Sequence, residues 1–181
     1  MRIDKVDKGY DNEINIGKNT LFVICDEKGV VIDNKEIANQ AAYYSYITIK
    51  GDNPYKQKED LRILARAIYK ENQDTEITIH SDGLVKPLIM PDNSRNIIHI
   101  ELKSSGIDYA ERVNANVMSN FIQGKSYFSF EAKSEEDVDE IEMIAKDLGI
   151  PKGKVFINPY SSKLLDKIKS LGYNVEFKIK W

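Results

Sequence analysis

Short strand-like segments alternate with amphipathic helix-like segments along the chain, and this alternation is the strongest constraint on its fold. The strand-like segments are rich in β-branched and aromatic residues, and they cover 20–25, 45–50, 76–80, 96–102, 127–132, 154–158 and 174–180. Helix-like periodicity covers 34–44, 57–71, 108–122, 135–148 and a last segment between Ser161 and Gly172. Strands that alternate with helices form βαβ units. The sequence therefore predicts an α/β fold with a mainly parallel sheet.

The helix at 135–148 has the most clearly marked ends. Ser134 is its expected N-cap, and Asp137 stands where a capping box places an acid. Gly149 marks its end. The segment 84–95 differs, because its two prolines disfavour a long helix. We expect that connection to be short or irregular.

Size and charge limit both the fold and the partners. The chain of 181 residues suits one domain spanning 1–181, and it is shorter than the roughly 250 residues of a complete eight-fold barrel. Its net charge of −3 predicts no broad nucleic-acid surface. No apolar run has the length of a transmembrane helix, and a single cysteine suits a reducing compartment. We expect a cytoplasmic protein without membrane association.

Polar loops follow almost every predicted strand. In parallel α/β folds the ligand lies at the carboxyl ends of the strands, so these loops form the expected functional rim. One interpretation is ordinary turn chemistry, because Gly, Asp, Asn and Pro form turns. The other is a polar cleft in which acid–base residues act on a small anionic metabolite. Its candidate catalytic residues are His80, Asp82, His99, Glu101 and Lys103.

No established metal or nucleophile motif is present. His80 and His99 lie on neighbouring predicted strands, but their spacing matches no metal motif, and we predict no metal site. Cys25 is the only cysteine. Because the chain has one cysteine, it cannot form an intramolecular disulfide, and its own thiolates cannot make a zinc or iron–sulfur site. A buried structural thiol is its expected role.

Several short motifs follow one another in a characteristic order. "MRIDKV" and "TLFVIC" (20–25) open the chain, and "ITIKGDNP" (47–54), "ITIHSDG" (77–83), "IHIELKSSG" (98–106) and "VFINP" (155–159) follow. A "LGY" turn and a strand ending in Trp181 close it. In this order the chain resembles the compact radical S-adenosylmethionine superfamily, and in particular the 7-carboxy-7-deazaguanine synthase family. The resemblance implies a mainly parallel (β/α) partial barrel of six or seven strands.

The resemblance also implies where a cofactor would bind. In the family, a Gly-Gly-Glu-Pro loop after the second strand contacts the amino group of S-adenosylmethionine. A Thr-Asn-Gly-like element follows the third strand. The corresponding cofactor-binding positions in this chain are Gly51, Asp52, Asn53, Pro54, Ser81 and Asp82.

Two departures separate the chain from the family's catalysts. The family binds a [4Fe–4S] cluster through a CxxxCxxC loop, whereas the loop 25–36 contains only Cys25. One thiolate cannot replace three, so we predict no iron–sulfur cluster and no reductive cleavage of S-adenosylmethionine. Asn53 replaces the family's Glu, and a neutral amide cannot make the same charge-assisted bond to an ammonium. Asp82 likewise replaces an Asn. We expect no cofactor, and binding of S-adenosylmethionine itself stays open.

Three functions remain as alternatives. The first is a non-catalytic binding or regulatory protein linked to nucleotide or deazapurine metabolism, whose rim binds a purine-like or nucleotide-like ligand. The second is the acid–base enzyme on an α/β barrel or half-barrel. The third is an assembly module that forms a homodimer or binds a protein partner. Tyr43, Tyr44 and Tyr46 are a candidate surface for it, although core packing explains them as well.

Overall fold

The computed structural model describes residues 1–10 and 18–176, and these form two compact units. Unit 1 comprises Met1–Ser81 and Val85–Asn96. Unit 2 comprises Asp82–Leu84 and the described part of Ile97–Trp181. The expectation of one domain stays a prediction, and the two units are described separately below.

Unit 1 contains a mixed sheet of strands in the order β3-β1-β2-β4-β5. The strands are β1 (Arg2–Tyr10), β2 (Asn19–Cys25), β3 (Val30–Val31), β4 (Tyr46–Gly51) and β5 (Glu76–Ser81). β1 is antiparallel to β2 and β3, whereas β4 is parallel to both β2 and β5. Parallel pairing brings the carboxyl ends of β2, β4 and β5 to the same edge of this sheet.

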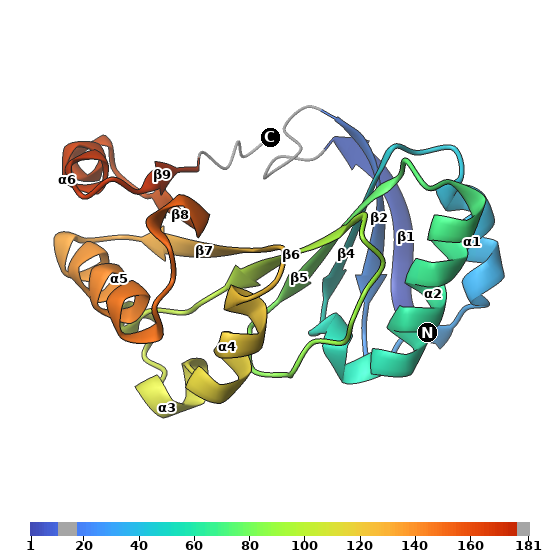
Figure 1. Ribbon diagram of the computed structural model, residues 1–181, viewed down its shortest axis with the longest axis horizontal. Helices are drawn as coiled ribbons and strands as arrows, with labels where there is room; N and C mark the ends of the chain where they lie inside the picture. The colour runs from blue at the N-terminus through green and yellow to red at the C-terminus, as the bar shows by residue number, and fades with distance from the viewer. Residues whose placement is uncertain (11–17, 177–181) are drawn as a thin grey trace. The chain divides into compact units, whose positions relative to one another are not determined.

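Two helices of unit 1 pack against each other beside this sheet (Figure 1). α1 (Asn34–Ala41) begins after Asp33, whose side chain accepts a hydrogen bond of 2.9 Å from the Lys35 backbone N–H. A short 3₁₀ helix, η1 (Pro54–Gln57), leads into α2 (Lys58–Glu71). The apolar residues of α2 recur every three or four positions, so they form one buried face: Leu61, Leu64, Ala65 and Ile68.

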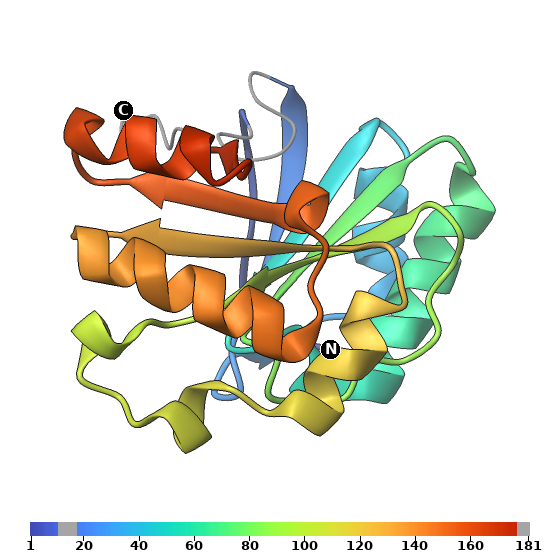
Figure 2. The ribbon, with the colours of Figure 1, turned by 60° about the vertical axis from the view of Figure 1, so that its left-hand side comes forward.

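Unit 2 contains β7 (Ser126–Ala132), β8 (Val155–Pro159) and β9 (Asn174–Val175), which pair in parallel. α5 (Glu135–Leu148) and α6 (Leu165–Ser170) lie alongside these strands (Figure 2). Three 3₁₀ helices complete the connections: η2 (Lys103–Ser105), η3 (Lys152–Lys154) and η4 (Ser162–Leu164). β6 (Ser94–His99) begins in unit 1 and ends in unit 2.

The coarser part of the predicted fold class is confirmed, because the described residues form a mixed α/β structure in which most paired strands are parallel. The partial barrel stays a prediction. All the predicted strands are present. β1 and β3 were not predicted, so the described residues contain nine strands rather than six or seven. The predicted strand 96–102 ends earlier, at His99. Residues 177–180 of the last predicted strand, and Trp181, lie outside the described residues.

The predicted helix 108–122 is wrong, since two helices occupy that segment. α3 (Tyr109–Arg112) and α4 (Ala115–Ile122) are separated at Asn114, whose backbone is extended. The Asn114 side chain accepts a hydrogen bond of 3.2 Å from the Val117 N–H and so caps α4.

Other local predictions are confirmed. Ser134 and Asp137 form a capping box at the start of α5, and Gly149 ends that helix in a left-handed conformation. The segment 84–95 contains no helix. Within residues 1–10 and 18–176, the structure has no helix whose length and apolar character would allow it to cross a membrane.

Candidate functional site

The loop after β4 is held in shape by backbone contacts to β2. Gly51 has a φ of +109°, and a Cβ at this position would lie 2.2 Å from the Cys25 carbonyl oxygen. The next residue, Asp52, donates its backbone N–H to the same carbonyl at 3.0 Å. Only glycine fits a site with this backbone conformation and this close approach. The glycine of the predicted cofactor loop is therefore required by local geometry.

Asn53 turns its side chain inward and connects two of the predicted elements. Asn53 is only 6% exposed to solvent. The Oδ1 atom accepts hydrogen bonds from the Tyr55 backbone N–H at 3.2 Å and from Ser81 Oγ at 3.3 Å. Asn53 thus caps η1 and ties the loop after β4 to the end of β5. The structure brings together Asn53 and Ser81, whereas Asp52 remains exposed at the rim.

Tyr55 is a buried residue of this region that the motif comparison did not identify. Its side chain is fully buried, and its hydroxyl donates to Asn96 Oδ1 at 2.5 Å. Burial raises the pKa of the Tyr55 phenol above its usual value. The signal in the sequence was an aromatic residue inside the polar turn "NPYKQ" (53–57). Tyr55 anchors the start of η1 beneath the rim.

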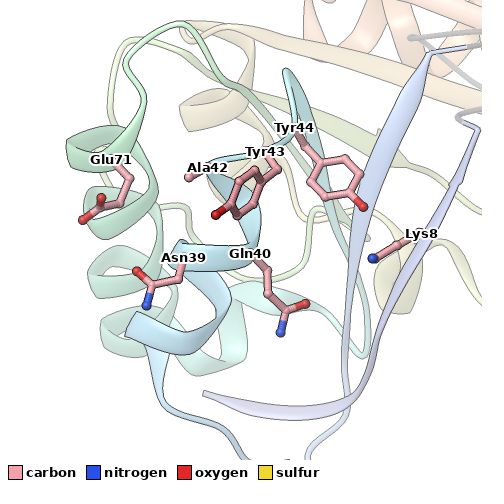
Figure 3. Close-up of a pocket in the computed structure, with 7 residues that line it drawn as sticks. All are labelled: Lys8, Asn39, Gln40, Ala42, Tyr43, Tyr44 and Glu71. Carbon is pink, nitrogen blue, oxygen red and sulfur yellow. The ribbon is translucent and has the colours of Figure 1, made fainter.

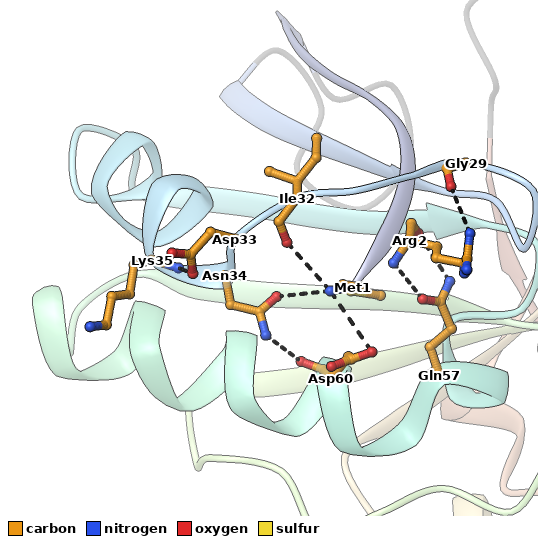
Figure 4. A network of polar contacts seen from close by, with 9 residues as sticks. All are labelled: Met1, Arg2, Gly29, Ile32, Asp33, Asn34, Lys35, Gln57 and Asp60. Atoms are coloured by element: carbon orange, nitrogen blue, oxygen red, sulfur yellow. Dashed lines mark hydrogen bonds and ion pairs between the residues drawn. The ribbon is translucent and has the colours of Figure 1, made fainter.

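The start of β1 is joined to the helices that follow the rim loops (Figure 4). Gln57 accepts from the Arg2 backbone N–H at 2.6 Å and donates to the Arg2 carbonyl at 3.0 Å. The Met1 amino group contacts the Ile32 carbonyl, the Asn34 side chain and, at 3.8 Å, the Asp60 carboxylate. These contacts fix the position of η1 and α2 relative to β1.

The turn after β2 occupies the position of the family's cluster loop. Asp26 accepts from the Lys28 N–H through its side chain at 2.7 Å and from the Gly29 N–H through its carbonyl at 3.0 Å. A Cβ on Gly29 would lie 2.5 Å from the backbone of Ile3. The chain then enters β3, which pairs with β1. This segment is a closed β-turn that packs directly on the neighbouring strand.

This donor set does not fit a [4Fe–4S] cluster. Such a cluster needs three thiolates from the loop, and Cys25 is the only cysteine of the 181 residues. The Cys25 side chain is 2% exposed, and burial raises the pKa of its thiol to about 12. A neutral buried thiol is a poor ligand, because metals bind the thiolate. Among the described residues, no three His, Cys, Asp or Glu side chains converge on a metal-binding geometry.

The candidate catalytic residues occupy separate environments. In unit 2, His99 and Glu101 line a cavity of about 220 Å³ together with Ser129, Glu131 and Lys133. Lys103 is not part of that lining, and its backbone N–H instead donates to Glu140 at 2.8 Å. His80, at the end of β5 in unit 1, is 9% exposed. Asp82 accepts from the Leu84 N–H at 2.8 Å as a turn residue.

The cavity beside His99 contains further polar groups besides the predicted catalytic residues. Ser129 donates to the buried Glu176 carboxylate at 3.0 Å. The Tyr160 hydroxyl donates to Glu131 at 3.1 Å, and the Lys133 ammonium lies 5.8 Å from the centre of the Tyr160 ring. Within unit 2, the structure therefore groups an imidazole, two carboxylates and an ammonium in one small polar cavity.

The chain is similar to the 7-carboxy-7-deazaguanine synthase of Hyperthermus butylicus. The two are 23% identical over 155 residues, which cover 77% of this chain and 61% of that protein. This chain thus spans about three fifths of the length of the curated relative that it matches. No family model matches the chain. The similarity indicates a distant relation and agrees with the resemblance in motif order.

Proposed function

We propose that this chain is a cluster-less relative of the radical S-adenosylmethionine enzymes, built on a partial (β/α) barrel. It binds a nucleotide-like or purine-like ligand at the rim formed by the strand ends, and it does not carry out radical chemistry. The distant similarity to a 7-carboxy-7-deazaguanine synthase and the ordered motif series support the family relation. Deazapurine or nucleotide metabolism is the setting that this relation suggests.

One observation carries the proposal: the turn after β2 lacks the three thiolates that bind a cluster. Its single thiol is buried and protonated, and its backbone is closed by the Asp26–Gly29 hydrogen bond of 3.0 Å. Reductive cleavage of S-adenosylmethionine needs an electron from a cluster bound at this position. A chain that has lost the cluster site while retaining the Gly51–Pro54 turn is expected to keep binding without that chemistry.

The side chain at position 53 supports the same conclusion. The Tyr55 backbone N–H and the Ser81 hydroxyl both donate to Asn53 Oδ1, so this oxygen serves to hold the loop. The exposed carboxylate of Asp52 is then the group of this loop that a ligand reaches. A carboxylate binds amines, amides and hydroxyls through charge-assisted hydrogen bonds. The proposed ligand therefore presents donors to Asp52.

The cluster part of the proposal is tested by anaerobic reconstitution with iron and sulfide. We expect no stoichiometric iron and no broad visible charge-transfer band. Uptake of about four irons per chain with that band would overturn the proposal. Cys25→Ser is the control, because iron that binds this variant equally well is not held by the thiol.

The ligand part is tested by calorimetric titration with S-adenosylmethionine, S-adenosylhomocysteine, GTP and a deazapurine. We expect one of these to bind and Asp52→Asn to weaken it by about tenfold. Asp74→Asn is the matched control, since Asp74 is also exposed in unit 1 but lies in the turn before β5. Absence of binding by all four compounds would contradict the proposed ligand class.

A second candidate function rests on the cavity beside His99. An imidazole with two carboxylates and a lysine supplies a general acid, a general base and an anion-binding group. Such a cavity suits acid–base chemistry on a small anionic metabolite. We expect His99→Gln to abolish turnover in a screen of such metabolites, with Lys103→Gln as the control because Lys103 does not line the cavity. Turnover that is lost equally in both variants would count against this function.

A further inference from the structure

A groove of about 680 Å³ lies in unit 1 near the amino-terminal end of β4 (Figure 3). It is formed by the end of α1, the end of α2 and strand β1. Its lining includes Lys8, Asn39, Gln40, Tyr43, Tyr44 and Glu71. β4 contains six residues and therefore separates this groove from the Gly51–Pro54 loop by about 20 Å. The groove is a different site from the rim.

Backbone hydrogen bonds fix the two tyrosines of the groove. The Tyr43 N–H donates to the Gln40 carbonyl at 3.3 Å, and the Tyr44 N–H donates to the Ala41 carbonyl at 2.9 Å. The Thr75 hydroxyl holds the Tyr44 carbonyl at 3.0 Å. Tyr43 is nevertheless 87% exposed. Core packing therefore does not explain Tyr43, and its ring is presented to solvent on a defined backbone.

The polar side chains of the groove are available to a ligand. Within the part of the chain that the structure describes, the side chains of Lys8, Asn39, Gln40 and Glu71 make no hydrogen bond or ion pair. Some other charged residues of the same elements are paired. Lys5 of β1 contacts Asp7 at 3.1 Å, and Glu59 of α2 pairs with Arg62. Lys8 and Glu71 therefore keep their charged groups available to a ligand in this groove.

The groups that line this groove have the chemistry that a nucleotide needs for stacking, charge pairing and hydrogen bonding. Figure 3 shows the two phenol rings between Lys8 on one side and Glu71 on the other, with the amides of Asn39 and Gln40 nearby. A flat heteroaromatic ring stacks on tyrosine, an anionic group is attracted to lysine, and a carboxylate accepts from two adjacent N–H donors. The volume lies within the ordinary range for small-ligand sites.

We propose that this groove binds a guanine mononucleotide. The base stacks on Tyr43 and Tyr44, the phosphate lies at Lys8, and the Glu71 carboxylate accepts from the ring N–H and the exocyclic amine of guanine. Adenine lacks this pair of donors, so the site discriminates between the two purines. The inference does not depend on a ligand at the rim.

Calorimetric titration of the whole chain with GMP, AMP and inorganic phosphate tests the proposal. We expect GMP to bind more tightly than AMP and phosphate to bind more weakly than both. Tyr44→Ala should weaken GMP binding by about tenfold, and Lys8→Gln should weaken it by a similar factor. Tyr43→Ala is the second ring variant, since its exposure makes a folding defect unexpected. Glu71→Gln should remove the preference for GMP over AMP.

Matched variants outside the groove test whether GMP binds in it. Lys5→Gln on β1 and Glu59→Gln on α2 change the same charges outside the groove and should leave GMP affinity unchanged. The proposal is overturned if GMP does not bind at millimolar concentration, if AMP or phosphate binds as tightly, or if the groove variants retain full affinity. It is equally overturned if Asp52→Asn, rather than Tyr44→Ala, removes binding.

Discussion

The two ends of strand β4 use polar and aromatic residues in opposite ways. At the carboxyl end, the loop residue Asn53 is buried and bonded to the protein, and Tyr55 beneath it is fully buried. At the amino end, Tyr43 is 87% exposed, and Gln40 beside it has no side-chain partner among the described residues. The loop that the family resemblance marks as functional is largely occupied with its own structure. The amino end of β4 matches no motif, and there the polar side chain of Gln40 has no hydrogen-bond partner among the described residues.

This difference separates the structural role of a motif residue from a role in binding a ligand. The backbone at Gly51 requires glycine, and Asn53, which stands where the family has Glu, holds the loop through its side chain. Selection for folding preserves such residues even when no ligand is bound, since a buried polar group without a partner costs stability. A motif match alone therefore does not distinguish a residue that binds a ligand from one that holds the loop. The comparison between the two ends is testable, because equivalent substitutions should affect them very differently.

The largest expected effect is that of Gly51→Ala. The new Cβ would lie 2.2 Å from the Cys25 carbonyl oxygen, and alanine disfavours a φ of +109°. We expect the free energy of unfolding to fall by more than about 3 kcal/mol, as measured by urea denaturation. Gly153→Ala is the control, because a Cβ there meets nothing within 4 Å. Similar losses in both variants would show that the contact with β2 is not what requires glycine.

The next largest effect compares one asparagine at each end of β4. Asn53→Ala leaves the Tyr55 N–H and the Ser81 hydroxyl without this acceptor, and it should lower the free energy of unfolding by about 1–3 kcal/mol. Asn39→Ala in the groove should change it by less than about 0.5 kcal/mol, because Asn39 is exposed. Denaturant titration of both variants measures the difference. Equal effects would remove the proposed contrast between a structural loop and an open groove.

Seven strands could be predicted because each contains several apolar residues in a short segment. The two strands that were missed, β1 and β3, lack this pattern. β1 reads "RIDKVDKGY" (2–10) and has few apolar positions, with Ile3 as its fully buried residue. β3 has only two residues, both exposed, and exists through its pairing with β1. The break at Asn114 was missed because the helical periodicity continues on both sides of it. The residue pattern of a single segment does not show which strand will pair with it. It also does not show where a capping residue will divide a continuous helical pattern into two helices.

The sequence predicted which loops form the candidate site, but it could not predict which side chains contact one another within it. Parallel order placed Asn53 and Ser81 at one edge, but their hydrogen bond depends on side-chain rotamers that no spacing rule gives. Lys103 was grouped with His99 by counting along an assumed strand. That strand ends at His99, and Lys103 instead begins η2, so the alternation of faces does not extend to it. The groove beside Tyr43 has no motif and could only be found from the structure.

The pH dependence of stability tests the buried state of Cys25. The thiol pKa is about 12 in the folded protein and near 8.5 in an unfolded chain, so only the unfolded chain loses this proton between those values. The unfolded state then binds fewer protons, and stability falls as the pH rises. The contribution is fully present below about pH 8.5. Above it, the loss approaches about 1.4 kcal/mol per pH unit.

Cys25→Ala isolates this contribution, because the other alkaline groups titrate in both proteins. The difference in free energy of unfolding between the natural chain and the variant should narrow steadily from pH 8 to pH 10. Denaturant titrations at several pH values measure it. A difference that stays constant over this range would mean that the thiol is accessible, and the turn after β2 would then be more open than its hydrogen bonds indicate.

The smallest expected effect compares two hydroxyl groups at the two ends of β4. Tyr55→Phe removes a donor from the buried Tyr55–Asn96 hydrogen bond of 2.5 Å, and it should lower the free energy of unfolding by about 1 kcal/mol. Tyr43→Phe removes an exposed hydroxyl and should leave stability unchanged within error. Thermal and urea unfolding of the two variants give the comparison directly. Because both substitutions delete one oxygen from a tyrosine, a difference between them reports the burial and the hydrogen bond of the Tyr55 hydroxyl. A loss at Tyr43 equal to that at Tyr55 would mean that Tyr43 is not the open ring on which guanine is proposed to stack.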